Sequence, residues 1–208
     1  MTIIYPIAAP TVRGPSSISL TPNDVVAVAV SPFTGSQQAQ RHQGQWWILT
    51  ADYSSLTKSQ TDLWFAFLTR LKWRYGTFTF GDPTKATPSG VATGTPVVNG
   101  SSQSGDYLNT RGWTPNVTGI LKAGDYIQIG TGSSTTLYRL TADASSDGSG
   151  NASLEIWPQI RQNASIPTDG ATVITANCVG QFRLDQPAAV KITPGPFGSV
   201  SIAAREAL

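Results

Sequence analysis

Residues 54–83 read SSLTKSQTDLWFAFLTRLKWRYGTFTFGDP, and this stretch decides the fold. Thr57, followed three residues later by Gln60, matches a capping box, which marks the start of a helix. Gly76 is placed to end that helix, because glycine readily adopts the left-handed conformation found just past a helix C-terminus. Apolar side chains form one stripe at helical spacing: Leu63, Trp64, Phe67, Leu68 and Leu71. We expect one helix over residues 54–75, packed on a sheet formed by the flanking strands.

The segment after the helix predicts a strand and then a boundary. Residues 77–80 alternate Thr and Phe, and Gly81-Asp82-Pro83 stops this alternation. Residues 84–95 contain few large apolar side chains and many Thr, Ser and Gly residues. Such a shift in composition is typical of a linker, so we place a module boundary near residue 95.

The segment before the helix predicts further strands. Residues 25–31 are apolar at nearly every position, which indicates a strand buried on both faces. Residues 32–35 carry the Pro and Gly of a turn. We expect residues 37–41 and 46–53 to pair as a hairpin that turns at residues 42–44, where the glycine supplies the turn conformation.

Residues 1–24 differ from the rest in being irregular and rich in proline, with Pro6, Pro10, Pro15 and Pro22. A segment of this kind usually lies extended over a neighbouring surface. The sequence leaves open whether that surface belongs to the same chain or to another subunit.

Residues 96–176 have the pattern of a separate small β module. Short candidate strands separated by Gly, Ser and Asp turns lie at residues 96–99, 108–110, 126–129, 136–141, 152–157 and 172–176. This spacing suggests a small β-barrel or sandwich. Residues 179–184 have the length of a strand that returns to the first sheet. The chain would then be mainly β with one main α-helix: a β-sandwich-like domain formed by residues 1–95 and 177–208, with the module inserted at an exposed loop. Residues 190–193 and 199–203 are expected to form a terminal hairpin around Pro194-Gly195-Pro196.

Composition excludes several classes of protein. The 208 residues are only 12% charged with a net charge of +2, which is too little for a nucleic-acid-binding arm or a polybasic membrane anchor. One cysteine excludes disulfides within the chain and cysteine-clustered zinc sites, and one histidine excludes any site with two imidazoles. No apolar run approaches a membrane span of roughly 20 residues. The N-terminus lacks signal-peptide features, so we expect a soluble protein made in a bacterial-type cytosol.

Candidate catalytic and metal-binding residues do not form a convincing site. Residues 143–151 resemble a calcium loop, but the twelfth position is Leu154 and the flanks predict strands rather than helices. His42 could serve as a general base, yet it lies in a polar turn without a G-x-S-x-G elbow. Most acidic residues stand beside glycine in turns, although a glycosidase pair could still meet in space. We expect no enzyme, no metal and no cofactor.

The tryptophans suggest contact surfaces. Adjacent Trp46 and Trp47 on one strand must point to opposite faces, so one belongs to the core and the other faces solvent or a partner. Trp113, between Gly112 and a nearby proline, is expected to be an exposed platform in the second module, and exposed Trp side chains often anchor interfaces. The interface candidates are Val26, Val28, Trp46, Trp47 and Trp113.

Several of these stretches resemble virion proteins of tailed phages. They are residues 31–38 (SPFTGSQQ), 44–47 (GQWW), 74–83 (RYGTFTFGDP), 121–129 (LKAGDYIQI), 137–140 (LYRL) and 154–158 (LEIWP). Over residues 25–184 the chain is similar to distal tail and baseplate-type proteins of siphophages that infect Gram-negative bacteria.

The resemblance implies a hexameric ring at the tail tip of the virion, built after synthesis in the host cytoplasm. Residues 1–95 and 177–208 would form the ring-forming, belt-like domain. The ring would join the tail-tube protein to the baseplate hub protein, and tail fibres could dock on it. Alternatives are a carbohydrate-binding module, another tail ring such as tube or terminator, and a tail-associated hydrolase.

Overall fold

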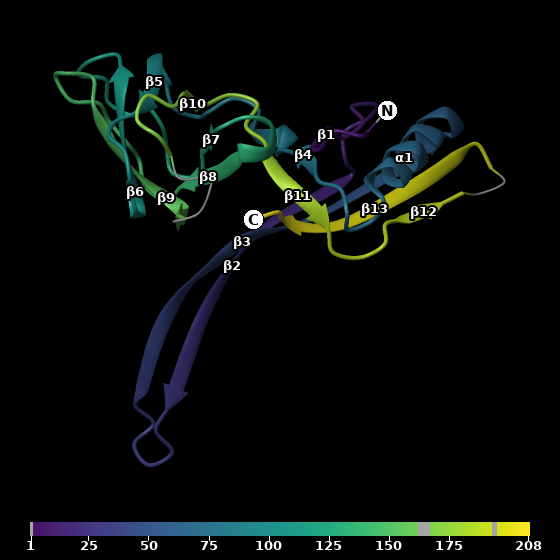
Figure 1. The fold of residues 1–208 in the computed structure, drawn as a ribbon, viewed down its shortest axis with the longest axis horizontal. Coiled ribbons are helices and arrows are strands. Elements are labelled where there is room, and N and C mark those ends of the chain that lie inside the picture. Colours follow the sequence, from purple (N-terminus) through teal and green to yellow (C-terminus); the bar gives the residue numbers. More distant parts are fainter. Residues whose placement is uncertain (1, 162–166, 193–194) are drawn as a thin grey trace.

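Two β-sheets and one α-helix dominate the fold, as the mainly β class predicted from the sequence requires (Figure 1). The computed structural model describes residues 2–161, 167–192 and 195–208. The first sheet contains β1 (Ile7–Ala8), β2 (Ser17–Val30), β3 (Gln37–Thr57), β4 (Phe78–Phe80), β11 (Gly180–Leu184), β12 (Ala189–Lys191) and β13 (Phe197–Glu206). The second contains β5 (Gly94–Val98), β6 (Gly105–Trp113), β7 (Tyr126–Ile129), β8 (Thr136–Leu140), β9 (Ala152–Ile160) and β10 (Val173–Ile174). The helix is α1 (Lys58–Leu71), and two 3-10 turns lie at Pro83–Lys85 and Gly132–Ser134.

The first sheet has the strand order β1-β4-β11-β13-β3-β2, with β12 paired to β13. Only the short β1–β4 pair is parallel. Side chains alternate along β3, so that Trp47, Leu49, Ala51 and Tyr53 are buried on one face while Thr50 and Asp52 are exposed on the other. The sheet therefore has one covered face and one polar face.

Helix α1 covers the end of this face near Tyr53. Thr57 and Gln60 form the expected capping box, and Trp64, Phe67 and Leu71 are buried, so the predicted helix is confirmed. The helix is shorter than expected. The predicted burial of Leu63 is wrong, because Leu63 is 53% exposed. The helix ends at Lys72, which takes the left-handed conformation; Gly76 lies beyond and donates its N–H to the Leu71 carbonyl.

The second sheet curls into a nearly closed barrel. Its order is β10-β7-β8-β9-β6-β5, and the two outer strands approach each other through a bridge between Val97 and Thr172. Val98 donates its N–H to the Ala171 carbonyl and accepts from the Gly170 N–H, which helps to close the gap. Its interior is filled by a separate apolar cluster, as a barrel of this size requires.

The chain returns from this barrel to the first sheet at β11, which lies between β4 and β13 as expected for residues 179–184. The barrel packs on the same sheet face as α1, at the end near Trp47. There Trp47 contacts the rings of Tyr126 and Trp157, and its indole N–H donates to the Leu137 carbonyl. The terminal hairpin pairs β12 with β13, while residues 193–194 of its expected turn lie outside the described residues.

The N-terminal segment is less irregular than the sequence suggested. Strand β2 begins at Ser17, and Pro22 is accommodated because β2 is the edge strand of the sheet. Before it, β1 pairs with β4, and Tyr5 donates its hydroxyl to the Arg70 carbonyl. Residues 3–12 thus pack largely on their own chain.

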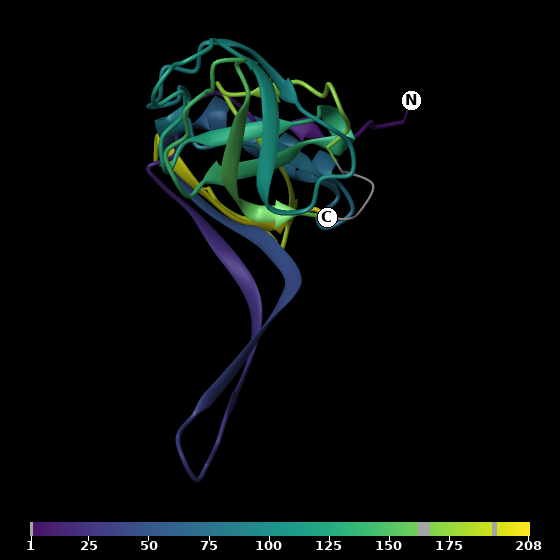
Figure 2. The same ribbon diagram turned by 90° about the vertical axis from the view of Figure 1, so that its left-hand side faces the viewer.

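The largest departure from expectation is the projecting hairpin made by the distal halves of β2 and β3 (Figures 1 and 2). We call residues 25–44 the arm. The predicted burial of residues 25–31 on both faces is wrong, since residues 25–30 are exposed and none of the described residues covers the arm in either view. The predicted turn at residues 42–44 is also wrong: β3 runs unbroken through it, and the hairpin reverses at residues 31–36 instead.

An irregularity in pairing explains the misplaced turn. Asp24 pairs with Gln45 and Val26 with Arg41, so three residues of β3 stand opposite Val25 alone. Extra residues in one strand bend a ribbon and increase its twist. Gly44 suits this place, because a Cβ there would lie 2.9 Å from a Val25 methyl group. The polar, glycine-containing stretch thus bends the arm away from the sheet rather than reversing it.

Candidate assembly surface

The arm exposes apolar side chains on an uncharged ribbon. Every residue from 25 to 40 except Ser31 is exposed, and none of these residues is charged. Cross-strand pairing places Val26, Val28 and Val30 on one face, and Ala27 and Ala29 on the other. The three valines are 47%, 54% and 56% exposed. A two-stranded ribbon with both faces in water is marginally stable by itself, so this surface is suited to being covered by a partner.

The tip of the arm is an ordered turn that presents an aromatic ring. Ser31 donates its N–H to the Ser36 carbonyl at 2.9 Å, and Gly35 donates to the Ser31 carbonyl at 2.9 Å. Gly35 has φ +68°, a conformation that favours glycine. Phe33 stands on this turn with 95% of its surface exposed. The ring is therefore displayed by a defined turn at the end of the arm.

The root of the arm is fixed to the inserted barrel by hydrogen bonds. Asp24 and Gln45 lie opposite each other, and the Gln45 amide donates to the Asp24 carboxylate. The Trp157 indole N–H donates to the same carboxylate at 3.1 Å. The buried Gln45 side chain also accepts the backbone N–H of Gln159 at 2.7 Å. These contacts set the direction in which the arm leaves the body.

An ion pair between Arg41 and Asp106 braces the arm further out. Both guanidinium nitrogens reach the carboxylate, at 3.0 and 3.1 Å. Hydrogen bonding to Asp106 raises the pKa of Arg41 above its already high value. Both side chains are more than 40% exposed, so the ion pair adds little to stability. Its contribution is to help fix the direction of the arm.

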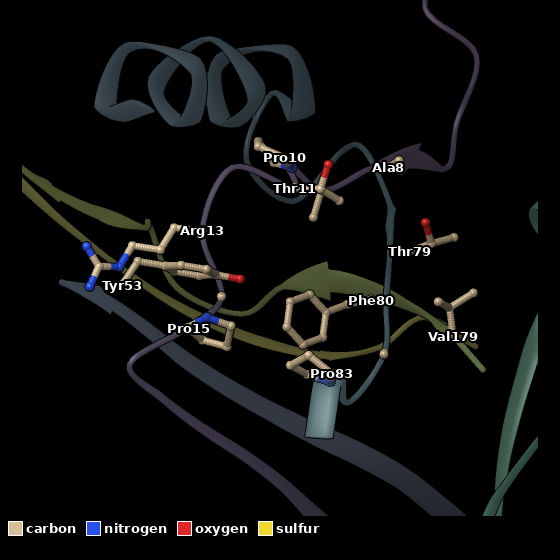
Figure 3. A pocket seen from close by; sticks show the side chains of 13 residues that line it. Ala8, Pro10, Thr11, Arg13, Pro15, Tyr53, Thr79, Phe80, Pro83 and Val179 are labelled. Atoms are coloured by element: carbon tan, nitrogen blue, oxygen red, sulfur yellow. The ribbon is translucent and has the colours of Figure 1, made fainter. Parts of the chain in front are cut away.

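A separate apolar cavity of about 390 Å³ lies in the body, beneath the N-terminal segment (Figure 3). Residues from the N-terminal segment, β3, β4 and the 3-10 turn that begins at Pro83 line it; those that define its walls are Pro10, Thr11, Pro15, Tyr53, Phe80 and Pro83. Figure 3 shows the Tyr53 hydroxyl pointing into the space between Thr11, Pro15 and Phe80. The guanidinium of Arg13 points away and donates to the Ser55 carbonyl. The interior of the cavity is thus uncharged.

Tyr53 aims its hydroxyl into this cavity. Its side chain is 3% exposed, and burial raises its pKa to about 12, so the phenol is neutral at physiological pH. Among the described residues none hydrogen-bonds to its hydroxyl, whereas its ring packs on Trp64 at 4.4 Å. A hydroxyl that opens into the cavity can donate to an occupant that brings a hydrogen-bond acceptor.

The interface candidates from the sequence divide into two groups. Val26 and Val28 are exposed on the arm. The expected split of the tryptophan pair is confirmed, with Trp47 buried at 1% and Trp46 half-buried. Trp47 itself is therefore no surface contact, because it joins the sheet to the barrel.

Trp113 is a clear correction. It is 3% exposed, and its indole N–H donates to the Thr110 hydroxyl at 2.8 Å inside the barrel. The nearby glycines allow close backbone packing over the ring rather than exposing it: a Cβ on Gly150 would meet the Trp113 carbonyl at 2.3 Å. Phe33 was missed, although an aromatic residue within a Pro-Phe-Thr-Gly turn has little chance of burial and could have been noticed.

The polar residues considered for catalysis have structural roles. Asp147 accepts the backbone N–H groups of Ser149 and Asn151, both at 2.8 Å, as a turn-forming aspartate does. His42 is exposed in the bend of the arm. Among the residues that the structure describes, five acidic side chains form ion pairs with Arg or Lys: Asp106, Asp143, Asp169, Asp185 and Glu206. Within the described ranges no cluster of three or more His, Cys, Asp or Glu side chains could hold a metal ion.

Neither a protein-family model nor a curated protein sequence matches this chain. In the part of the chain that the structure describes, no helix is long and apolar enough to cross a membrane. The arm and the cavity are therefore interpreted from their own geometry.

Proposed function

We propose that the chain is a structural subunit of a phage tail that assembles with copies of itself into a ring, for which six copies are expected. The uncovered arm, which is uncharged over residues 25–40, is the observation that carries this proposal. In the virion the ring would sit at the distal end of the tail tube and join the tail-tube protein to the baseplate hub protein, with tail fibres as possible further partners. Its role is mechanical, and it needs no enzyme activity, metal or cofactor.

The physical argument begins with the arm's surface. Burying apolar surface yields roughly 25 cal/mol per Å², and the valine face is left in water by the isolated chain. Fifteen exposed residues between 25 and 40 approach the roughly 20–30 residues per side of a standard interface. Contact by such an arm with a different surface of the next copy is heterologous, and heterologous contacts close into rings when the rotation permits.

The barrel supports the alternative of a carbohydrate-binding module less well. That alternative needs an exposed Trp platform, yet Trp113 is buried and Trp157 packs on Trp47 with its indole N–H on Asp24. A hydrolase would need two unengaged carboxylates facing one substrate. The turn-forming and ion-paired acids described above do not offer such a pair.

The decisive experiment measures the mass of the purified full chain by light scattering across a concentration series, with negative-stain images of the same peak. We expect a ring of about six subunits. Val26→Ser with Val28→Ser should weaken the ring, whereas Ala27→Ser with Ala29→Ser, on the opposite face of the same strand, serves as the matched control. A monomer at every concentration would contradict the proposal.

A further inference from the structure

The arm tip and the cavity in the body are complementary in chemistry. Phe33 is a fully displayed aromatic ring on an uncharged turn, and the cavity is an uncharged slot with the ring of Phe80 and three prolines in its walls. When two uncharged apolar surfaces come together, no charged group has to lose its hydration. The Phe33 ring would fill the cavity, and the cavity walls would remove the ring from water.

The two features also match in size. A cavity of about 150 Å³ is enough to hold benzene, so about 390 Å³ accommodates a phenyl ring together with part of the turn that carries it. Another apolar hollow, beside Phe65 of α1 and Trp73 just beyond the helix, measures about 220 Å³ and contains no buried unpartnered hydroxyl among its described lining residues. The larger cavity is therefore the better receptor for the tip.

Tyr53 adds a directional contact. Its neutral hydroxyl points into the cavity and has no partner among the described residues. A turn brings backbone carbonyl groups that point outward, since only some of them are used inside the turn. A carbonyl of residues 32–34 entering beside the Phe33 ring would accept the Tyr53 hydrogen bond.

The tip and the cavity of one chain cannot meet each other. Figures 1 and 2 show the arm projecting away from the body, with its tip far from β1 and β4, which contribute to the cavity wall. The root contacts of Asp24 and Gln45 and the Arg41–Asp106 pair hold the arm in that direction. The occupant of the cavity must then come from another molecule.

We propose that Phe33 of one copy inserts into the cavity between Pro10, Tyr53 and Phe80 of the next copy. This contact rests on the proposed function, because it names how neighbouring subunits of the ring hold each other. It is heterologous: the knob and the hole lie on different parts of the same chain, so each copy gives one tip and receives another.

The test uses one variant for each half of the contact. Phe33→Asp replaces the ring with a charged carboxylate, which would lose its hydration in the apolar cavity. Thr11→Trp places an indole over the cavity from an exposed position in the N-terminal segment. Gln38→Asp on the exposed shaft of the arm and Ser149→Trp in an exposed turn of the barrel are the matched controls.

We expect each test variant to associate about 10- to 100-fold more weakly than the unaltered chain, as the loss of one buried Phe side chain predicts. The controls should assemble normally. Mixing Phe33→Asp with Thr11→Trp leaves one intact tip and one intact cavity, so the mixture should form pairs that neither variant forms alone. Mass photometry or light scattering distinguishes these species.

Other results separate the two proposals. If the unaltered chain forms rings and Phe33→Asp forms them equally well, the tip contact is wrong and the ring function stands. If Phe33→Asp breaks the ring but Thr11→Trp does not, the tip docks elsewhere and the inference is also overturned. An unaltered chain that stays monomeric overturns the ring function and the tip contact with it.

A disulfide supplies a second readout that does not depend on how well Thr11→Trp folds. Thr34→Cys, which leaves the Phe33 ring in place, combined with Thr11→Cys should give a ladder of cross-linked oligomers under mild oxidation, because a tip seated in the cavity brings these positions together. Each variant with only one of the two added cysteines should give no ladder, because the native Cys178 is buried. Absence of cross-linking in assembled rings of the double variant counts against the contact.

Discussion

Arg161 and Glu206 form an ion pair of 2.6 Å that joins the end of β9 to the last residue of β13. Their side chains are only 13% and 3% exposed. The Arg161 guanidinium also donates to the Gln45 carbonyl, and the Glu206 carboxylate accepts the Trp47 backbone N–H. The pair thus ties the barrel, the first sheet and the root of the arm at one buried point.

Removing one partner of this pair should be costly, because the other charge stays buried. We expect Glu206→Gln to lower the free energy of unfolding by about 3 kcal/mol in urea titrations. Asp106→Asn, which breaks the exposed pair with Arg41, should cost less than about 1 kcal/mol. Arg161→Met with Glu206→Leu should recover part of the loss, since no charge is then left unpaired. Equal costs for Glu206→Gln and Asp106→Asn would contradict a special role for the buried pair.

Asp125 should make the stability of the barrel depend on acid. Burial alone raises the pKa of Asp125, but the backbone N–H groups of Ser89, Gly90 and Lys122 donate to its carboxylate and lower the pKa overall. A lowered folded pKa means that this stability is complete above the unfolded pKa of about 3.9 and is lost as pH falls through the folded value.

The measurement for Asp125 compares urea unfolding at pH 7 and pH 3. Asp125→Asn should destabilise by about 1–3 kcal/mol at pH 7, because the amide has no charge and keeps only one acceptor oxygen for three N–H groups. The difference between variant and unaltered chain should shrink at pH 3. Asp62→Asn, on the exposed side of α1, is the control. A difference that stays constant with pH would show that the carboxylate charge is not the cause.

Local signals explain what the sequence predicts well. The capping box at Thr57, the buried stripe through Trp64 and Phe67, and the strand at residues 126–129 all depend on neighbours a few residues apart. The return of β11 to the first sheet was predictable for a similar reason, since its length and alternation suit a strand beside β4.

The arm could not be placed in the same way. An apolar run such as residues 25–31 is typical of a strand covered on both faces, whether the cover is part of the same chain or of another copy. The apolar pattern indicates that both faces of the strand are suited to burial. It does not indicate whether the same chain or another copy buries them. The prediction of a turn at residues 42–44 was wrong for a related reason, because Gly44 suits a turn and a close approach to Val25 equally well. The prediction that Trp113 is exposed was wrong for the same reason, because glycines beside a residue are compatible both with an exposed turn and with close packing.

The helix cap gives a prediction confined to one end of α1. Thr57 accepts the Gln60 N–H with its hydroxyl, and the Gln60 side chain accepts the Thr57 N–H. Thr57→Ala should therefore reduce the free energy of unfolding by about 1 kcal/mol. Lys58→Ala, one residue further on and outside the capping box, should change it by less than about 0.5 kcal/mol. Chemical denaturation followed by circular dichroism measures both, and a neutral Thr57→Ala would show that the cap contributes nothing.

Cys178 should resist modification as long as the chain is folded. Its thiol is 6% exposed and donates to the carbonyl groups of Tyr126 and Ile174 where the barrel meets the sheet. Burial raises its pKa to about 12, so at pH 8 only on the order of one thiol in 10⁴ is the reactive thiolate. Labelling with a thiol reagent should be at least about 1,000-fold slower in the native chain than in urea. Thr34→Cys at the exposed arm tip is the control and should label rapidly in the native chain. Comparable native rates at residues 34 and 178 would mean that the junction between barrel and sheet opens readily, and that the arm is not held in the fixed direction that tip-to-cavity assembly requires.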